Sequence, residues 1–250
     1  MTMFESDSAY DAFMGRYSRR LAPLFADFAG LADGSSVADV GAGTGALSSE
    51  LVARGLRVAA ADPSPQFVDA VRGHLPDVDT RVAPAEELPW EDESFDASLA
   101  QLVVAFMRDA PAGVHEMRRI VKPGGTVAVC MWDRQGMEML AAVWRARKVV
   151  GHEVPMADTR YRTREEIEIL FGEGFADMRT ELIETEAAYT GFDEFWSALS
   201  GGAGPAGAWL AALSGEQREA AHAELHRQLG EPAGPFSLTA KAWATRARRA

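Results

Sequence analysis

Cysteine is nearly absent from the 250-residue sequence, which contains only Cys130. A single cysteine cannot form an internal disulfide, and its setting in "VAVCMW" predicts a buried strand position and not a nucleophile. The sequence also lacks any apolar run of about 18 residues, and its start, "MTMFESDSAY", lacks the basic and apolar segments of a signal peptide. We therefore expect a cytoplasmic protein in a reducing compartment, with no membrane attachment.

Positive charge is scarce as well. The 25 Lys and Arg residues are outnumbered by 37 Asp and Glu residues, which gives a formal net charge of -12. Such a charge repels phosphate backbones and anionic lipids, so nucleic acid and membranes are not expected partners. The hydrophobic fraction of 47% and charged fraction of 25% are those of an ordinary water-soluble globular protein. Nothing in these numbers indicates the oligomeric state.

Strand patterns and helical patterns alternate through the first half of the chain. A helical pattern at residues 10–29 precedes the first strand. Four further strands are then predicted, in "RVAAAD", "DTRVAP", "SFDASLAQ" and "GTVAVCMW". Helical patterns separate most of them. This order predicts an α/β fold in which a mostly parallel sheet carries helices on both faces.

The second half of the chain departs from this alternation. Helices are predicted at residues 137–151 and 163–175, and two further strands at 178–189 and 236–248 bring the total to seven. The segment between these last strands, residues 190–235, is far longer than a hairpin loop. Its "SGEQ" has the spacing of a capping box at the start of a helix. We therefore expect a helical insert between the last two strands.

Three glycines follow the first strand in "VADVGAGTG", at positions 41, 43 and 45. A glycine turn between a strand and a helix lets a ligand approach the backbone and the unpaired N–H groups of the helix N-terminus. The dinucleotide fingerprint is G-x-G-x-x-G, whereas here the third glycine comes one position earlier. This spacing indicates a cofactor-binding turn and disfavours NAD.

Two acidic residues accompany the turn. Asp39 lies two positions before Gly41, and Asp62 ends the second strand 21 positions after Gly41. An acid near the turn favours a cationic ligand, and an acid about 20 residues onward is placed to accept hydrogen bonds from ribose hydroxyls. Together they predict a cofactor that contains ribose and carries positive charge.

The region from about Tyr10 to Asp133 resembles the class I S-adenosylmethionine-dependent methyltransferases, in particular their small-molecule group. The segments that carry the resemblance are "VADVGAGTG", "DPSPQFVDAVR", "AEELPWEDESFDAS" and "EMRRIVKPGGTVAV". The resemblance implies a Rossmann-like fold, S-adenosylmethionine as the cofactor and S-adenosylhomocysteine as its product. It also implies a small-molecule methyl acceptor.

The resemblance further implies which residues contact the cofactor. The turn residues Gly41, Ala42 and Gly43, with Asp39 before them, would face the methionyl part. The ribose would be held by Asp62 and Pro63, the adenine by Ala85 and Glu86, and the sulfonium side would be lined by Gln101 and Leu102. The family often has Asp in the triplet before the glutamate. Pro84 stands there in this chain, so the adenine contact is expected from backbone and Glu86.

The N-terminal segment "YDAFMGRYS" resembles one that this group folds over the cofactor. Tyr10, Arg16 and Tyr17 are the candidates for this cover, and an arginine there could bind the methionyl carboxylate. The alternative is that Tyr17 is helix core and Arg16 a surface charge. Both interpretations stay open on the sequence alone.

We expect one methyltransferase domain over residues 1–250. Its parts would be an N-terminal cover (1–35), a cofactor-binding core (36–133), a substrate-side half of the sheet (134–189 with 236–250) and the insert (190–235). The insert is predicted to roof the acceptor site and to hinge at residues 200–207. Its aromatic residues, Phe192, Phe195, Trp196 and Trp209, would either contact a planar acceptor or hold the insert's helices together.

Methyl transfer is an in-line displacement that needs orientation above all, so no catalytic acid or base is assigned. His222 and His226 share a helix face, but no third ligand is evident and no metal site is expected. Two alternatives remain. The protein could bind the cofactor without transferring methyl, as a cyclase or regulatory module, or it could be an NAD-dependent oxidoreductase, which the glycine spacing disfavours. The acceptor atom is not indicated.

Overall fold

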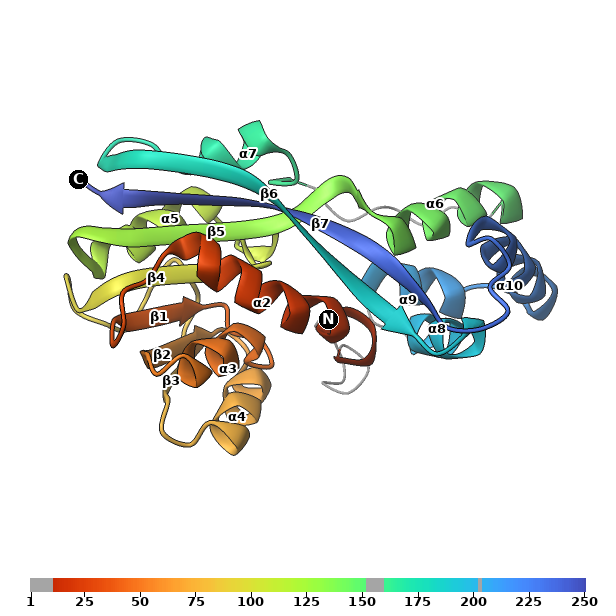
Figure 1. Ribbon diagram of the computed structural model, residues 1–250, viewed down its shortest axis with the longest axis horizontal. Helices are drawn as coiled ribbons and strands as arrows, with labels where there is room; N and C mark the ends of the chain where they lie inside the picture. Colours follow the sequence, from red (N-terminus) through yellow and green to blue (C-terminus); the bar gives the residue numbers. More distant parts are fainter. Residues whose placement is uncertain (1–10, 152–159, 202–203) are drawn as a thin grey trace. The chain divides into compact units, whose positions relative to one another are not determined.

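The computed structural model describes residues 11–151, 160–201 and 204–250 (Figure 1). The chain divides into two compact units. The core unit comprises Ser18–Asp133, Arg160–Ile183 and Ala242–Ala250, and the insert unit comprises Met1–Tyr17, Arg134–Thr159 and Glu184–Lys241.

Strands and helices alternate in the first half of the chain, as predicted. In order, the elements are a π-helical turn at Asp11–Gly15, α2 (Arg16–Ala29), β1 (Ser36–Val40), α3 (Ala46–Ala53), β2 (Arg57–Asp62), α4 (Pro65–His74), β3 (Asp79–Val82), β4 (Phe95–Gln101), a 3-10 turn at Val104–Phe106, α5 (Ala110–Arg119) and β5 (Val121–Met137). The second half contains α6 (Glu138–Val150), α7 (Arg164–Glu168), β6 (Phe175–Tyr189), α8 (Phe192–Ser200), α9 (Gly204–Ala211), α10 (Gly215–Gln228) and β7 (Phe236–Arg249).

The seven strands form one sheet in the order β3-β2-β1-β4-β5-β7-β6. The pairs β1–β2, β1–β4, β2–β3 and β4–β5 are all parallel. Figure 1 shows β7 running opposite to its neighbours β5 and β6. The predicted mostly parallel, seven-stranded sheet is therefore confirmed. The order turns back beside β1, so the carboxyl ends of β1, β2 and β4 meet where open α/β sheets bind ligands.

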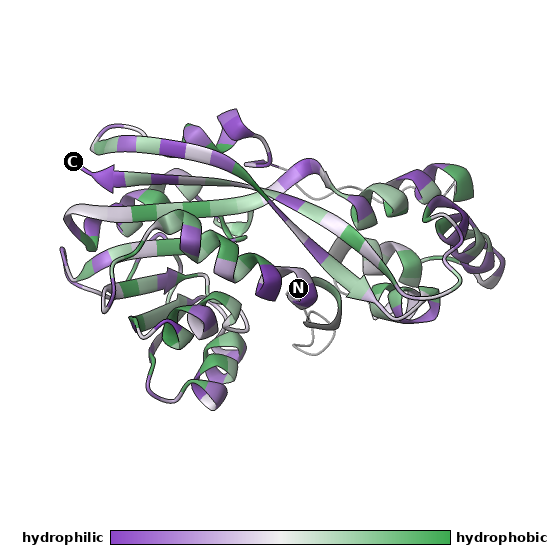
Figure 2. Cartoon of the chain, in the orientation of Figure 1, coloured by the Kyte–Doolittle hydropathy of each residue, from purple (hydrophilic) through white to green (hydrophobic). Residues whose placement is uncertain are grey.

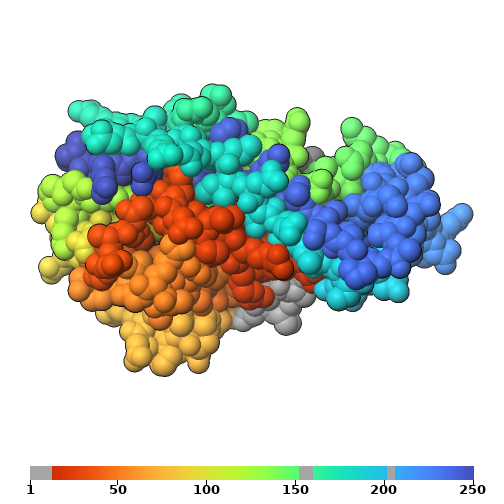
Figure 3. Space-filling model, in the orientation of Figure 1, coloured from red at the N-terminus to blue at the C-terminus, as the bar shows by residue number. Residues whose placement is uncertain are grey.

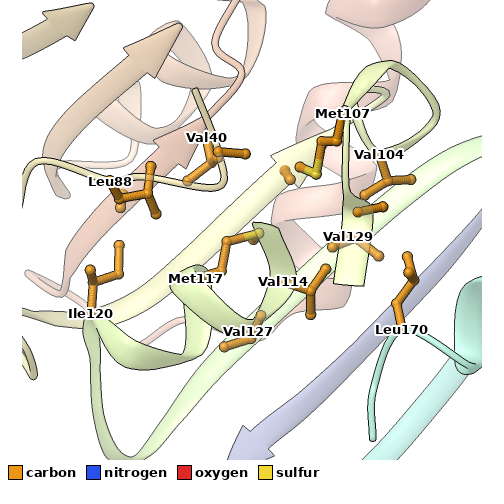
Figure 4. Close-up of a cluster of buried hydrophobic side chains, with 14 of the residues drawn as sticks. Val40, Leu88, Val104, Met107, Val114, Met117, Ile120, Val127, Val129 and Leu170 are labelled. Carbon is orange, nitrogen blue, oxygen red and sulfur yellow. The ribbon is translucent and has the colours of Figure 1, made fainter. Parts of the chain in front are cut away.

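Alternate residues of β2 show that helices cover both faces of the sheet. Ala59 and Ala61 belong to the main hydrophobic cluster, which includes Val114 and Met117 of α5. Ala60 belongs to a second cluster with Val71 of α4. Because successive strand side chains point to opposite faces, α5 and α4 cover opposite faces. Figure 4 shows the main cluster, in which α5 side chains lie against β5.

The helices of the core unit are also joined by polar contacts. Arg54, which follows α3, donates to the carboxylate of Asp27 at 2.6 Å and to the carbonyl oxygen of Pro23 at 2.9 Å, both on α2. On the face drawn in Figure 3, α2 in red and the orange α3–α4 region lie side by side. These contacts fix the helix that follows the glycine turn to its neighbour.

Two elements differ in length from their predictions. β5 begins at Val121, four residues before the predicted strand "GTVAVCMW", because Val121 already pairs with Phe95 across an irregularity in the β4–β5 ladder. The helix predicted over 163–175 is limited to α7. Thr163 caps its start, and glycines 172 and 174 follow, the second with a φ of 87° that breaks the helix.

The insert unit contains α6 and, between β6 and β7, the helices α8, α9 and α10, so the helical insert between the last two strands is confirmed. Ser214 and Gln217 form the predicted capping box at the start of α10. Phe195 and Trp209 are fully buried, which favours the packing role for these aromatics. Figure 2 shows α10 as largely hydrophilic, with Ala221 and Leu225 as its buried residues. No helix in the described parts of the chain has the length and apolarity needed to cross a membrane.

Candidate functional site

The turn after β1 depends on glycine for its backbone conformation. Gly41, Gly43 and Gly45 have φ values of 73°, 53° and 82°, a region that other residues seldom adopt. A Cβ atom on Gly41 would overlap the side chain of Val103. A Cβ atom on Gly43, in contrast, would meet no atom within 4 Å. The backbone of Gly43 therefore faces open space on the side where a side chain would lie.

Backbone hydrogen bonds fix the turn to the second strand. The N–H groups of Gly41 and Ala42 both donate to the carbonyl oxygen of Ala61, at 2.8 and 3.1 Å. The N–H of Gly45 closes the turn on the carbonyl oxygen of Ala42 at 2.9 Å. Because β2 in turn ends at Asp62, the glycine turn and this carboxylate are held in a fixed relation.

Asp62 joins the end of β2 to the glycine turn. Its side chain is 6% exposed, and its two oxygens accept hydrogen bonds at 2.9 Å from the N–H groups of Gly43 and Ser64. Burial raises the pKa of this carboxyl, and the two N–H groups oppose the rise. A carboxylate has lone pairs beyond these two bonds, so it can still accept from hydroxyl groups. Pro63, the next residue, is exposed.

Asp39 lies behind the turn and is 1% exposed. Its Oδ2 atom accepts a hydrogen bond of 2.6 Å from the hydroxyl of Ser48 in the first turn of α3. The N-cap of this helix is Gly45, which has no side chain to cap it, so Asp39 supplies an acceptor from the neighbouring strand. Burial raises the pKa of Asp39 to about 7, with a smaller contribution from Asp62, while hydrogen bonds from Ser48 lower it.

Gln101 is the last residue of β4, and Leu102 follows it. The side-chain amide of Gln101 donates to the carbonyl oxygen of Ser18 at 3.1 Å, while its Oε1 atom is buried without a hydrogen-bond partner among the described residues. Leu102 is buried with a φ of 63° and donates its N–H to the carbonyl oxygen of Cys130 at 2.9 Å. A left-handed leucine is a strained backbone position, and such positions concentrate at functional sites.

The two predicted adenine contacts have partners within the core unit. Ala85 is buried in the main cluster, and a Cβ atom on Gly113 of α5 would lie 3.3 Å from it. Glu86 accepts a hydrogen bond of 2.8 Å from the backbone N–H of Asp109, the N-cap of α5. The side chain of Ala85 thus packs in the core, which leaves its backbone and Glu86 as the groups able to contact a base.

The predicted N-terminal cover is only partly described. Tyr10 lies outside the described residues. Arg16 donates to Oε1 of Glu194 at 2.8 Å and to the carbonyl oxygen of Ala188 at 3.0 Å, and its guanidinium lies 4.4 Å from the ring centre of Tyr189. Tyr17 is fully buried, and its hydroxyl lies 3.1 Å from that of Tyr189. Both residues therefore have partners within the insert unit, and their role as a cover stays a prediction.

The candidate metal and nucleophile residues have packing partners. The rings of His222 and His226 meet the ring of Phe192 edge to face, at 4.9 and 4.7 Å between centroids. Across residues 11–151, 160–201 and 204–250, no three His, Cys, Asp or Glu side chains gather in a metal-binding group. Cys130 is buried, as predicted, and burial raises the pKa of its thiol, which favours the uncharged form.

The sequence reasoning missed three residues of this site, namely Ser48, Ser64 and Val103. Ser48 is the third residue of α3, a position whose free N–H and side chain commonly take part in capping, and this spacing is a signal that could have found it. Ser64 could have been found as the N-cap of α4. Nothing in the sequence places Val103 against Gly41, because that contact joins segments about 60 residues apart.

Comparisons with known proteins agree with this geometry. Residues 38–129 match a family described as "Methyltransferase domain". An uncharacterized methyltransferase of Mycobacterium tuberculosis is 37% identical over 117 residues, which is 47% of this chain and 47% of the relative. A demethylmenaquinone methyltransferase of Mycobacterium sp. strain JLS is 34% identical over 116 residues, 46% of this chain and 50% of the relative. The chain thus spans about half the length of the curated relatives it matches.

Solved structures share the fold over nearly the whole chain. A candidate type II methyltransferase of Anaeromyxobacter dehalogenans has a TM-score of 0.68 at 24% identity, over 92% of this chain and 95% of that one. The [4+2]-cyclase SpnF has a TM-score of 0.54 at 20% identity, over 92% of this chain and 80% of that one. At these identities the likeness establishes the fold alone. Together these comparisons show a methyltransferase domain over residues 38–129, within a chain that has the Rossmann-like fold of the methyltransferases.

Proposed function

We propose that the chain binds S-adenosylmethionine at the glycine turn and transfers its methyl group to a small-molecule acceptor. The observation that carries the proposal is the pair of buried carboxyls, Asp39 and Asp62, on either side of a glycine turn whose Gly43 faces open space. A buried carboxylate is costly without an opposite charge, and neither Asp39 nor Asp62 forms an ion pair with a described residue. A sulfonium cofactor with a ribose supplies both a cation and hydrogen-bond donors.

The residues of the core unit fit this group. Gly43 leaves the space that a side chain would fill, Asp62 offers a carboxylate to the two ribose hydroxyls, and Oε1 of Gln101 is a buried acceptor in need of a donor. The backbone beside Ala85, with Glu86, would contact the adenine. Leu102 would line the sulfonium side. Its left-handed backbone is held in place by the hydrogen bond from its N–H to the carbonyl oxygen of Cys130.

When bound, the cofactor supplies a methyl group that is activated by the positive charge on sulfur. The chain's own task is to hold the acceptor behind that methyl carbon and to exclude water, since an in-line displacement gains most from orientation. Gly43, Asp62 and Gln101 would hold a cofactor whose methyl carbon is open to displacement by the acceptor atom, with the neutral thioether as the leaving group. A proton carried by the acceptor atom passes to solvent or to a base.

A small molecule is the acceptor class that we propose. The formal net charge of -12 disfavours nucleic acid. One relative that shares the matched region is described as acting on demethylmenaquinone, which is itself a small molecule. The chain covers half of that relative, so demethylmenaquinone is a compound to be tested and not an assignment.

Two measurements test the proposal. Isothermal titration of the purified chain with S-adenosylmethionine and with S-adenosylhomocysteine should give saturable binding of both compounds, whereas NADH should not bind. Methyl-labelled cofactor, incubated with the protein and a panel of quinols, phenols and amines, should then give a labelled product. If the folded protein binds neither compound, the cofactor assignment is refuted. If the label stays on the cofactor with every acceptor tested, methyl transfer to these acceptors is refuted.

Binding without methyl transfer is the second candidate function. It is favoured by one observation, the shared fold of a protein described as a cyclase. The two functions differ in a single measurable respect, namely whether S-adenosylhomocysteine accumulates during turnover. If the protein binds the cofactor tightly and converts a substrate but forms no S-adenosylhomocysteine, it binds the cofactor without transferring methyl.

A further inference from the structure

Strand β6 lies at one end of the sheet and has an unpaired edge. Among the described strands its only neighbour is β7, and Figure 1 shows it as the outermost strand of the sheet. Contacts with β7 occupy its other edge, where the hydroxyls of Thr180 and Thr245 lie 2.9 Å apart and the N–H of Ala250 donates to Gly174 at 3.0 Å. The unpaired edge therefore offers backbone N–H and C=O groups to another strand.

The core unit contains a regular segment of this edge, residues 178–183, which we call the edge segment. Asp177 precedes it with a left-handed φ of 52°, which interrupts the extended backbone. Edges that stay unpaired commonly carry proline or blocking charges. The edge segment, "MRTELI", has no proline, and its one Arg and one Glu cancel, although the chain as a whole has a formal net charge of -12. This segment is therefore not protected by net charge.

One face of the edge segment is apolar and exposed. Met178 and Leu182 are 47% and 43% exposed, and each lies two positions from Thr180, so the three share a face. Glu168, the last residue of α7, interacts with the hydroxyl of Thr180, which places α7 on the same face. Ile169, the residue after it, is 77% exposed. Apolar side chains therefore lie beside the unpaired edge without cover from the described residues.

The opposite face of the edge segment carries one charge of each sign. Arg179 and Glu181 form an ion pair with each other, and their side chains are 59% and 43% exposed. An exposed ion pair of this kind contributes little to stability. Both groups can therefore interact with further charges of opposite sign.

This pattern is complementary to itself. Two copies of a strand related by a two-fold axis and paired antiparallel must place one residue opposite its own copy, because directly opposite side chains share a face. When Thr180 is that residue, Arg179 lies opposite the partner's Glu181, and Met178 lies opposite the partner's Leu182. Centring the pair on Arg179 or on Glu181 would instead bring like charges together.

We propose that the edge segment of β6 pairs with the same segment of a second copy of this chain, antiparallel and centred on Thr180. The four charges then alternate in sign on one face, and the apolar side chains cover one another on the other face. The paired segment is short compared with permanent interfaces, which bury about 800 Å² on each partner. The dimer is therefore in reversible equilibrium with the monomer.

The other edge of the sheet provides a matched control. On β3, Asp79 and Arg81 form an ion pair on either side of Thr80, the same arrangement of charges as in the edge segment. This strand has only four residues, and Val82 is its one exposed apolar side chain. Charge alone would favour both edges equally, whereas length and apolar area favour β6.

Sedimentation velocity of the full chain, over a wide range of protein concentration, tests for the dimer. We expect the mean mass to rise with concentration toward twice that of the chain. A mass that stays at that of the monomer at every concentration would overturn the proposal. A mass that grows beyond the dimer would also overturn it, because a two-fold pair of edges leaves no further copy of the edge segment unpaired.

Charge reversals test the surface and the register. Arg179→Glu and Glu181→Arg should each be monomeric, because each brings four like charges together across the pair. An equimolar mixture of these two variants should regain the dimer, and so should the double variant that exchanges the charges. Arg81→Glu, the control on β3, should dimerise like wild type. A dimer that survives either single reversal, or that Arg81→Glu dissociates, would contradict the proposal, as would failure of the mixture to dimerise when circular dichroism shows both variants folded.

Discussion

Replacing Asp39 by Asn should make the ligand-free protein more stable above neutral pH. The substitution keeps the size of the side chain and an oxygen that can accept from Ser48, and it removes the buried negative charge. The carboxyl has a pKa of about 7 in the folded protein, against about 3.9 in an unfolded chain. Each unit of difference corresponds to about 1.36 kcal/mol, so the charge costs at most about 4 kcal/mol of stability at pH 8.

The sign follows from proton binding. Between about pH 4 and pH 7 the unfolded chain has lost the proton of Asp39 while the folded chain retains it, so its contribution to the free energy of unfolding falls as pH rises. Below pH 4 both states are protonated and the contribution is fully present. Above pH 7 both are ionised and it is lost. The Asn variant has no such titration.

Urea denaturation from pH 4.5 to pH 8, without ligand, measures this effect. The difference in unfolding free energy between Asp39→Asn and wild type should grow over this range, in favour of the variant. Other titrating groups are common to both proteins and largely cancel. Glu50→Gln serves as the control, since removing this partly exposed carboxyl and its ion pair with Arg54 should change stability by no more than about 1 kcal/mol. A difference that is constant with pH, or a variant less stable than wild type at pH 8, would refute the reasoning.

Three further predictions concern other parts of the chain. Gly41→Ala should lower the free energy of unfolding by about 1 to 3 kcal/mol, because its φ is 73° and its Cβ would overlap Val103; an unchanged urea midpoint would show that the turn can relax. Asp62→Ala should weaken S-adenosylmethionine binding by roughly 1.5 to 3 kcal/mol, and an unaltered Kd by calorimetry would exclude the ribose contact. Ser214→Ala should destabilise the chain by about 0.5 to 2 kcal/mol in thermal unfolding, since it removes the capping box of α10, whereas Ser214→Gly should cost less.

The strand and helix order could be predicted because it depends on local patterns. Alternation, glycine turns and caps are properties of short segments, and they placed β2, α6, β6 and β7 close to their observed bounds. The shortening of α7 and the early start of β5 were not predicted. The first depends on a left-handed Gly174, and the second depends on pairing with a strand about 25 residues earlier.

The fold class, the glycine turn and the two acids beside it could be predicted, because they follow from residue types at fixed spacings along one βαβ unit. The surroundings of those acids depend on the folded protein. It buried Asp39 against Ser48, bound Asp62 to the N–H groups of Gly43 and Ser64, and brought no described cation to either. Solvation and charge depend on atoms that meet across the fold, and spacing along the chain does not specify them.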